Sequence, residues 1–166
     1  MSIDDLYGER SYIRGKISAC EIKIGDLEKT VKRLEKEITE LKEDVRRLKD
    51  INKKIQSAIV CLKHSIPNIE RAHKSVNDYY SDSGHTWTWL SKISRVSEKA
   101  NTHISRFKKI KGDSLDVIKQ LNDEIRKKQN SVQEYTGTIN RTKTEKRNYE
   151  DDLRRIQYEI DNYDDE

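Results

Sequence analysis

Hydrophobic side chains recur at alternating steps of four and three residues along the first half of the chain. The residues between them are mostly Lys, Arg, Glu and Asp. This heptad seam predicts one long amphipathic helix over about residues 10–80, with its apolar stripe buried against another helix. The uninterrupted part of the seam consists of Ile13, Ile17, Cys20, Ile24, Leu27, Val31, Leu34, Ile38, Leu41, Val45 and Leu48.

Beyond this part the seam continues to Tyr80, with polar interruptions. Asn52 takes the next seam position, and a single polar core residue of this kind sets register and partner choice at some cost in stability. Pro67 removes one helical hydrogen bond, so we expect a kink near residues 63–67.

A second helical arm is predicted over about residues 87–163. The lower part of its seam, from Ile118 to Tyr163, is shifted by four residues relative to the upper part, which indicates a stutter at residues 111–114. Gly112 weakens a helix at that point, so the arm is either one helix with a flaw or two helices in line. The upper part of the seam consists of Trp89, Ile93, Val96, Ala100, His103, Phe107 and Ile110.

The stretch SDSGHT, residues 81–86, separates the two arms and has the Ser, Asp and Gly that a turn needs. The predicted fold over residues 1–166 is therefore all-α, a single elongated antiparallel two-helix hairpin resembling a coiled coil. An alternative register places Asn52 opposite Lys128 and makes residues 67–112 a separate head. The layers of the simpler hairpin are Leu62 with Phe107, Ile59 with Ile110, Asn52 with Leu121, and Ile24 with Tyr149.

Composition supports a thin helical protein, because 39% of the residues are charged, 33% are hydrophobic, and there is one Pro. The net charge of +4 reflects a mixed surface, which argues against nucleic acid as the main partner. We interpret the basic stretch at 106–111 as a solvated helix face, with a nucleic-acid role as a third possibility. The longest apolar run, residues 58–62, is too short to span a bilayer.

The cysteine and histidine positions predict neither a disulfide nor a metal site. Cys20 and Cys61 lie about 60 Å apart if one helix holds both, so two reduced thiols are expected, as in a cytosol. The four histidines have no metal-ligand spacing. With no Gly-rich phosphate loop and no nucleophile constellation, we expect no cofactor and no enzymatic activity.

Both tryptophans lie beside the predicted turn, in the stretch GHTWTWL. We expect Trp89 to close the open end of the hairpin beside Tyr80, and Trp87 to be partly exposed because it cannot share the same helix face. A long helix, a short tryptophan-bearing turn and a second long helix resemble the WXG superfamily of type VII secretion. The chain is most similar to its LXG-toxin-associated helical proteins, the YwqH-like group, and its stretch YGERSYIRGKISACEIKIGDLEKTVKRLEKEI carries the rest of the resemblance.

This resemblance implies a cytoplasmic partner or targeting protein that binds the N-terminal helical domain of an LXG-type toxin. A second small helical protein is a further expected partner, and export together with the partner is left open. The family's export tag, Tyr followed four residues later by Asp or Glu, is not found at Tyr149 or Tyr158. Trp89 stands where the family turn has Gly. The partner role is therefore the one that the resemblance implies.

The second arm has a weak seam from Lys128 to Lys146, so the stronger first arm is expected to offer apolar surface to a partner helix. The alternative function is a coiled-coil scaffold or stalk-like chaperone, as a parallel homodimer, because β-branched residues and Leu alternate at the two seam positions of the first arm. The candidate partner-binding residues are Trp87, Trp89, Leu27, Leu34, Ile38, Leu41, Val45 and Leu48.

Overall fold

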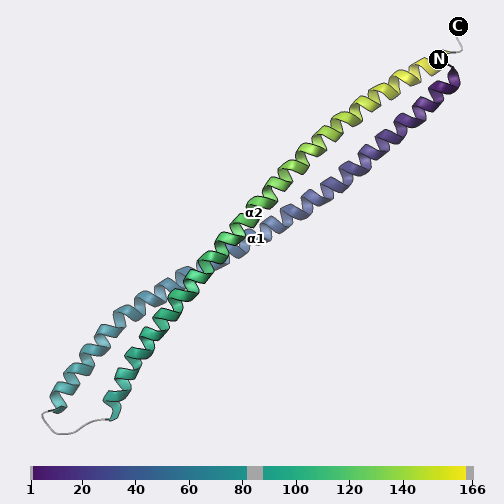
Figure 1. The fold of residues 1–166 in the computed structure, drawn as a ribbon. Coiled ribbons are helices and arrows are strands. Elements are labelled where there is room, and N and C mark those ends of the chain that lie inside the picture. The colour runs from purple at the N-terminus through teal and green to yellow at the C-terminus, as the bar shows by residue number, and fades with distance from the viewer. Residues whose placement is uncertain (1, 82–87, 164–166) are drawn as a thin grey trace. The chain divides into compact units, whose positions relative to one another are not determined.

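Two helices account for the protein in a computed structural model that describes residues 2–81 and 88–163. Helix α1 spans Ile3–Ser81, and helix α2 spans Thr88–Asp161 (Figure 1). The prediction of an all-α fold in which two helices pack against each other as a hairpin is confirmed. Of the predicted turn at 81–86, Ser81 is the last residue of α1 and the rest lies outside the described residues.

Helix α1 begins earlier than the seam alone indicates because Ser2 and Asp5 form a cap. The backbone N–H of Asp5 donates to Ser2 Oγ at 3.2 Å, and the Ser2 nitrogen donates to the Asp5 carboxylate at 2.9 Å. The Ser2 hydroxyl also donates to the Asp5 carboxylate at 2.7 Å, and this bond, together with the one from the Ser2 nitrogen, lowers the pKa of Asp5 below its ordinary value. The helix then continues through Pro67 without ending.

The two helices contribute to two compact units. Unit 1 comprises Met1–Glu40 and Glu124–Glu166, and unit 2 comprises Leu41–Asp123. Each unit therefore contains a segment of α1 and a segment of α2, and each has its own apolar cluster.

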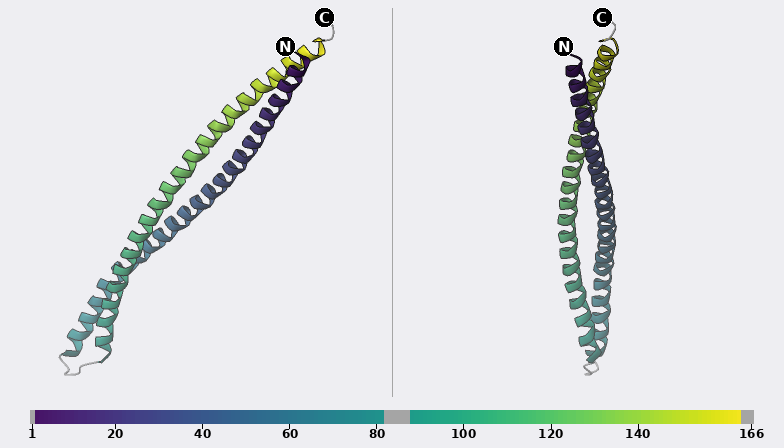
Figure 2. Two further views of the ribbon diagram at one scale, coloured as in Figure 1. Left: turned by 45° about the vertical axis from the view of Figure 1, so that its right-hand side comes forward. Right: turned by 90° about the vertical axis from the view of Figure 1, so that its right-hand side faces the viewer.

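In unit 1 the two helix segments lie side by side and antiparallel (Figure 2). The direction follows from the ion pairs, because Glu21 bonds Lys146 at 2.8 Å whereas Glu37, further along α1, bonds Lys128 at 2.7 Å, earlier in α2. Apolar side chains from both ends of the chain form its core. That cluster consists of Leu6, Ile13, Ile156 and Ile160, with Ile17, Tyr149 and Leu153 packed against it.

Unit 2 has the same antiparallel arrangement. Lys111 Nζ donates to Gln56 Oε1 at 2.7 Å, and Ser97 Oγ donates to a Glu70 carboxylate oxygen at 2.8 Å. Between these two bonds lies an apolar cluster of Ile59, Ile66 and Ile104, with Ile55, Leu62, Ala100 and Phe107 packed against it.

The register of the helices differs from the expected one. Asn52 was expected opposite Leu121, but it shares a groove with Lys111 and Leu115. Lys111 also bonds Gln56, one helical turn after Asn52. The pairing of Ile59 with Ile110 is also wrong, because Ile110 is exposed whereas Ile59 packs with Ile104.

Two further register expectations involve residues of α2 in unit 1. Tyr149 packs in the cluster that contains Ile17, one heptad before the expected partner Ile24. The alternative that placed Asn52 opposite Lys128 is excluded too, because Lys128 pairs with Glu37. The different partner of Tyr149 follows from the unshifted seam of α2.

The seam of α2 keeps one heptad phase from Ser97 to Ile160, with no shift at 111–114. Val96 and Ile110, expected on the seam, are 49% and 51% exposed. The upper part of α2 has two apolar stripes, one through Val96 and Ile110 and one through Ile104. The stripe through Ile104 is buried because it has the same heptad phase as Ile118, whereas a change of phase by four residues would locally unwind the helix pair. The buried or half-buried residues at one seam position are Ser97, Ile104, Lys111, Ile118, Ile125, Val132, Ile139, Lys146, Leu153 and Ile160.

Candidate partner-binding surfaces

The six predicted partner-binding residues of α1 all lie on its seam. Ile38 and Val45 are buried. The four leucines among the candidates are half-buried, since a second helix covers a seam from one side only. The remaining apolar area belongs to Leu27, Leu34, Leu41 and Leu48. Partner binding by these residues stays a prediction.

The tryptophans cannot be placed in the same way. Trp87 lies outside the described residues, and Trp89 belongs to the first turn of α2, but its side chain is not among those described. The expectations that Trp89 packs beside Tyr80 and that Trp87 is partly exposed stay predictions.

An apolar groove that the sequence did not single out lies on α1 in unit 1. Ile22, which is 65% exposed, lines it together with Ala19 and Leu27. Lys23, Asp26 and Thr30 complete a lining that encloses about 520 Å³. We call this surface the Ile22 groove. It was missed because Ile22 is off the seam, where an isolated apolar residue is ordinary.

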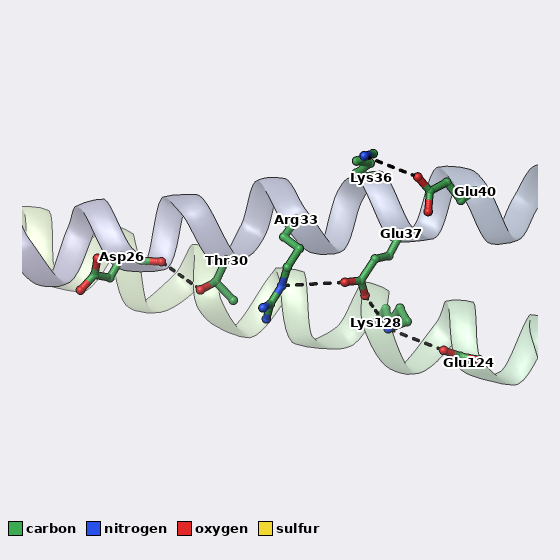
Figure 3. Close-up of polar contacts among 8 residues, drawn as sticks. All are labelled: Asp26, Thr30, Arg33, Lys36, Glu37, Glu40, Glu124 and Lys128. Atoms are coloured by element: carbon green, nitrogen blue, oxygen red, sulfur yellow. Dashed lines mark hydrogen bonds and ion pairs between the residues drawn. The ribbon is translucent and has the colours of Figure 1, made fainter.

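Ion pairs occupy the part of the α2 seam that is weak in sequence. Lys128 Nζ lies 2.7 Å from Glu37 and 3.6 Å from Glu124, and Arg33 lies 3.8 Å from Glu37 (Figure 3). The hydrogen bond from Lys128 lowers the pKa of Glu37, and the same bond raises the pKa of Lys128. Lys128 thus fills a seam position by burying its aliphatic stem and directing its charge to carboxylates at the edge.

Lys146 repeats this arrangement further along α2. Its Nζ lies 2.8 Å from Glu21 and 3.2 Å from Glu150, and hydrogen bonds to both carboxylates raise its pKa. Lys143 bonds Glu28 at 2.9 Å across the same pair of helices. Exposed ion pairs contribute little stability, so their effect is to favour this register over others.

A second groove lies in unit 2 around Asn52, and we call it the Asn52 groove. It has a volume of about 670 Å³. Asn52 is only 7% exposed, as expected of a polar core residue, yet neither its amide oxygen nor its amide nitrogen has a hydrogen-bond partner. Ser114 Oγ is likewise buried without a partner. The lining residues are Arg46, Lys49, Asp50, Asn52, Lys53, Gln56, Ser57, Lys111 and Leu115.

Leaving a buried amide unpaired costs about 1–3 kcal/mol. Leu115, 50% exposed, lies on the same groove. Ser114 lay within the expected stutter at 111–114 and Leu115 lay off the expected seam, so the sequence singled out neither as a core or groove residue. The signal that could have found them is the spacing of Ile104 and Ile118, two heptads apart with Lys111 between them.

The described residues form neither a metal site nor a membrane-spanning helix. Within 2–81 and 88–163, no group of three or more His, Cys, Asp or Glu side chains is placed to hold a metal ion. Among these residues, no helix has the length and apolar character needed to cross a bilayer. Cys20 is buried and Cys61 is exposed, and both are free thiols, as predicted.

Comparison with known proteins adds no relative. No family model, curated protein or solved structure matches the chain.

Proposed function

We propose that the protein is a non-enzymatic helical partner protein that acts in the cytoplasm by packing α1 against a helix of another protein. Following the resemblance of its sequence, the partner is the N-terminal helical domain of an LXG-type toxin, prepared for type VII secretion. A second small helical protein is a further candidate component of the same complex.

The observation that carries this proposal is the Ile22 groove. Ala19, Ile22, Asp26 and Thr30 follow one another at steps of three and four, the spacing at which one helix presents a continuous strip to another. Covering an exposed Ile side chain contributes about 1.5–3 kcal/mol, which is enough to make Ile22 an anchor of the complex. The half-buried Leu27 extends the strip towards the seam.

The proposal is tested by co-expression with a candidate LXG domain and measurement of the affinity of the purified pair. Ile22→Asp should weaken binding about tenfold or more, because it places a charge in the apolar contact. Val60→Asp is the matched control, since Val60 on the same helix is also exposed but lines neither the Ile22 groove nor the Asn52 groove. Equal losses in both variants, or no binding by the unaltered protein, would contradict the proposal.

The tryptophan-bearing stretch gives a second test of the same function. Trp87→Ala should leave the helix content unchanged and weaken binding, as expected of an exposed aromatic anchor. Loss of helix content in this variant would instead indicate that the side chain packs within the hairpin.

A coiled-coil scaffold acting as a parallel homodimer is the second candidate. The feature that favours it is the seam of α1, where β-branched residues and Leu alternate at the two heptad positions as in parallel two-stranded coiled coils. The mass in solution separates the two functions. A hairpin awaiting its partner has a mass of 19.6 kDa, whereas the homodimer has twice this value.

A further inference from the structure

The strongest feature outside the proposed contact is the charge around the Asn52 groove. Four of its nine lining residues are cationic, namely Arg46, Lys49, Lys53 and Lys111, and only Asp50 is anionic. Unit 2 as a whole has 17 Lys and Arg against 10 Asp and Glu, whereas unit 1 has 17 against 20. The groove therefore lies in the basic part of the chain.

Only part of this positive charge is neutralised by neighbouring residues. Arg46 pairs with Glu43 at 2.8 Å, and Lys111 bonds the neutral amide of Gln56 at 2.7 Å. Lys49 and Lys53 form no ion pair with the residues that the structure describes. These two ammonium groups are free to meet carboxylates of a bound molecule.

Part of the groove lining is apolar. Leu115 is half exposed there, and the aliphatic stems of the surrounding lysines add further apolar surface. Asn52 lies beside it, buried but with an unpartnered amide. Apolar surface, four cationic side chains and one unsatisfied amide in one lining match an amphipathic helix with acidic flanks and a polar residue at its centre.

Two other occupants fit less well. A second copy of this chain would bring the same four cations against the groove, and like charges facing each other oppose binding. Single-stranded nucleic acid binds through aromatic stacking platforms, and the nine lining residues include no aromatic side chain. An acidic amphipathic helix can pair with the cationic side chains and cover the apolar part of the lining at the same time.

We propose that the Asn52 groove binds an acidic amphipathic helix of the partner, whose central polar side chain bonds the amide of Asn52 after a rotation of the Asn52 side chain. The inference rests on the proposed function, because it takes the protein to be a binder of helices. It adds the chemistry of the partner, and it places the contact in unit 2.

The probe is a synthetic helical peptide of about 20 residues, long enough to be helical, with a Leu face, Glu flanks and a central Asn. Binding to the full chain is measured by fluorescence anisotropy at about 50 mM and about 300 mM salt, because screening weakens contacts between exposed charges. The Glu peptide should bind and should weaken with salt, whereas a peptide with Lys in place of Glu should not bind. Binding of the Lys peptide as tightly as the Glu peptide, or no binding of the Glu peptide, overturns the proposal.

Charge reversal locates the contact. Lys49→Glu with Lys53→Glu should weaken the Glu peptide about tenfold. Lys54→Glu with Lys109→Glu is the matched control, because it changes the net charge equally at exposed positions outside the groove lining and should change affinity less than about threefold. Equal effects of the two double variants would mean non-specific attraction to unit 2. If a DNA strand of equal charge binds more tightly than the peptide, the ligand of the groove is a nucleic acid and the proposal of an acidic helix is overturned.

The central polar residue is tested by exchanging both partners. Asn52→Leu should reverse the preference, so that a peptide with central Leu binds at least about fivefold better than the peptide with central Asn. An unchanged preference overturns the role of Asn52. If the unaltered protein binds the LXG domain but not the Glu peptide, this inference alone is refuted. If it binds the Glu peptide but not the LXG domain, only the proposed toxin partner is refuted.

Discussion

Replacing Asn52 by Leu should make the protein more stable. Leu has nearly the shape of Asn, with methyl groups in place of the amide nitrogen and oxygen, so the change removes the polar atoms with little overpacking. Both amide atoms of Asn52 are buried without partners, and the seam neighbours Val45 and Ile59 are buried apolar side chains. The substitution therefore converts an unfavourable seam layer into an ordinary one.

The magnitude follows from two contributions. Removing the unpaired amide recovers about 1–3 kcal/mol, and burying the new methyl groups adds about 1.5–3 kcal/mol in a fully closed core. The Asn52 groove opens this layer on one side, so the apolar contribution is reduced. We expect the free energy of unfolding to rise by about 2–4 kcal/mol. With a urea m-value of about 2 kcal/mol/M, the midpoint moves up by about 1–2 M.

The assay is urea unfolding followed by far-UV circular dichroism. Tryptophan fluorescence adds a second probe, because both tryptophans of the sequence fall within unit 2. Ile59→Asn is the matched control, since it introduces a second buried amide one heptad away and should lower stability by a similar amount. A midpoint for Asn52→Leu equal to or below that of the unaltered protein would refute the reasoning, because the amide must then make a favourable bond.

Three further predictions test the register, the ion pairs and the thiols. Ile104→Ala should lower the free energy of unfolding by about 2–5 kcal/mol, whereas Ile110→Ala should change it by less than about 0.5 kcal/mol; similar losses would restore the shifted seam. The pKa of Glu37 is lowered by Lys128, so Glu37 contributes stability above its ordinary pKa of 4.5 and loses it as the pH falls below that value. The difference in midpoint between the unaltered protein and Glu37→Gln should therefore shrink from pH 7 to pH 3; a constant difference would mean that the charge of Glu37 is irrelevant. In the native protein a thiol reagent should label Cys61 rapidly and Cys20 only after unfolding, with labelling followed by mass spectrometry; equal rates would contradict the burial of Cys20.

The fold was predictable because one periodicity dominates α1. From Ile13 to Leu48 no polar residue competes for the seam, and one helix face is the only way to bury all these side chains. The burial of Asn52 followed from the same phase.

The register was not predictable by the same reasoning. In the upper part of α2 the residues Val96 and Ile110 form an apolar stripe that competes with the one containing Ile104. The stripe of Val96 and Ile110 is the more apolar one, but the stripe of Ile104 is continuous in phase with Ile118. Lys111 can occupy a seam position in that second stripe because its aliphatic stem is apolar. The difference in free energy between the two registers is a sum over many seam layers, so no single residue reveals which register is more stable.

Both candidate grooves required the structure. Ile22 and Leu115 lie off the seam in the expected arrangement, and their exposure depends on which side of each helix the neighbouring helix covers. The seam leucines were identified from the sequence, but their half-buried state depends on the number of helices that cover them.

The constant heptad phase makes the length of unit 1 adjustable in matched steps. Seven residues can be deleted from α1 between Glu21 and Glu37 and seven from α2 between Lys128 and Lys146, and both ion pairs then keep their partners. A deletion in one helix alone would slide one chain segment past the other by a full heptad and separate one of these pairs. Variation in length during evolution is therefore expected to be paired between the two helices, because a change in one is tolerated only together with an equal change in the other.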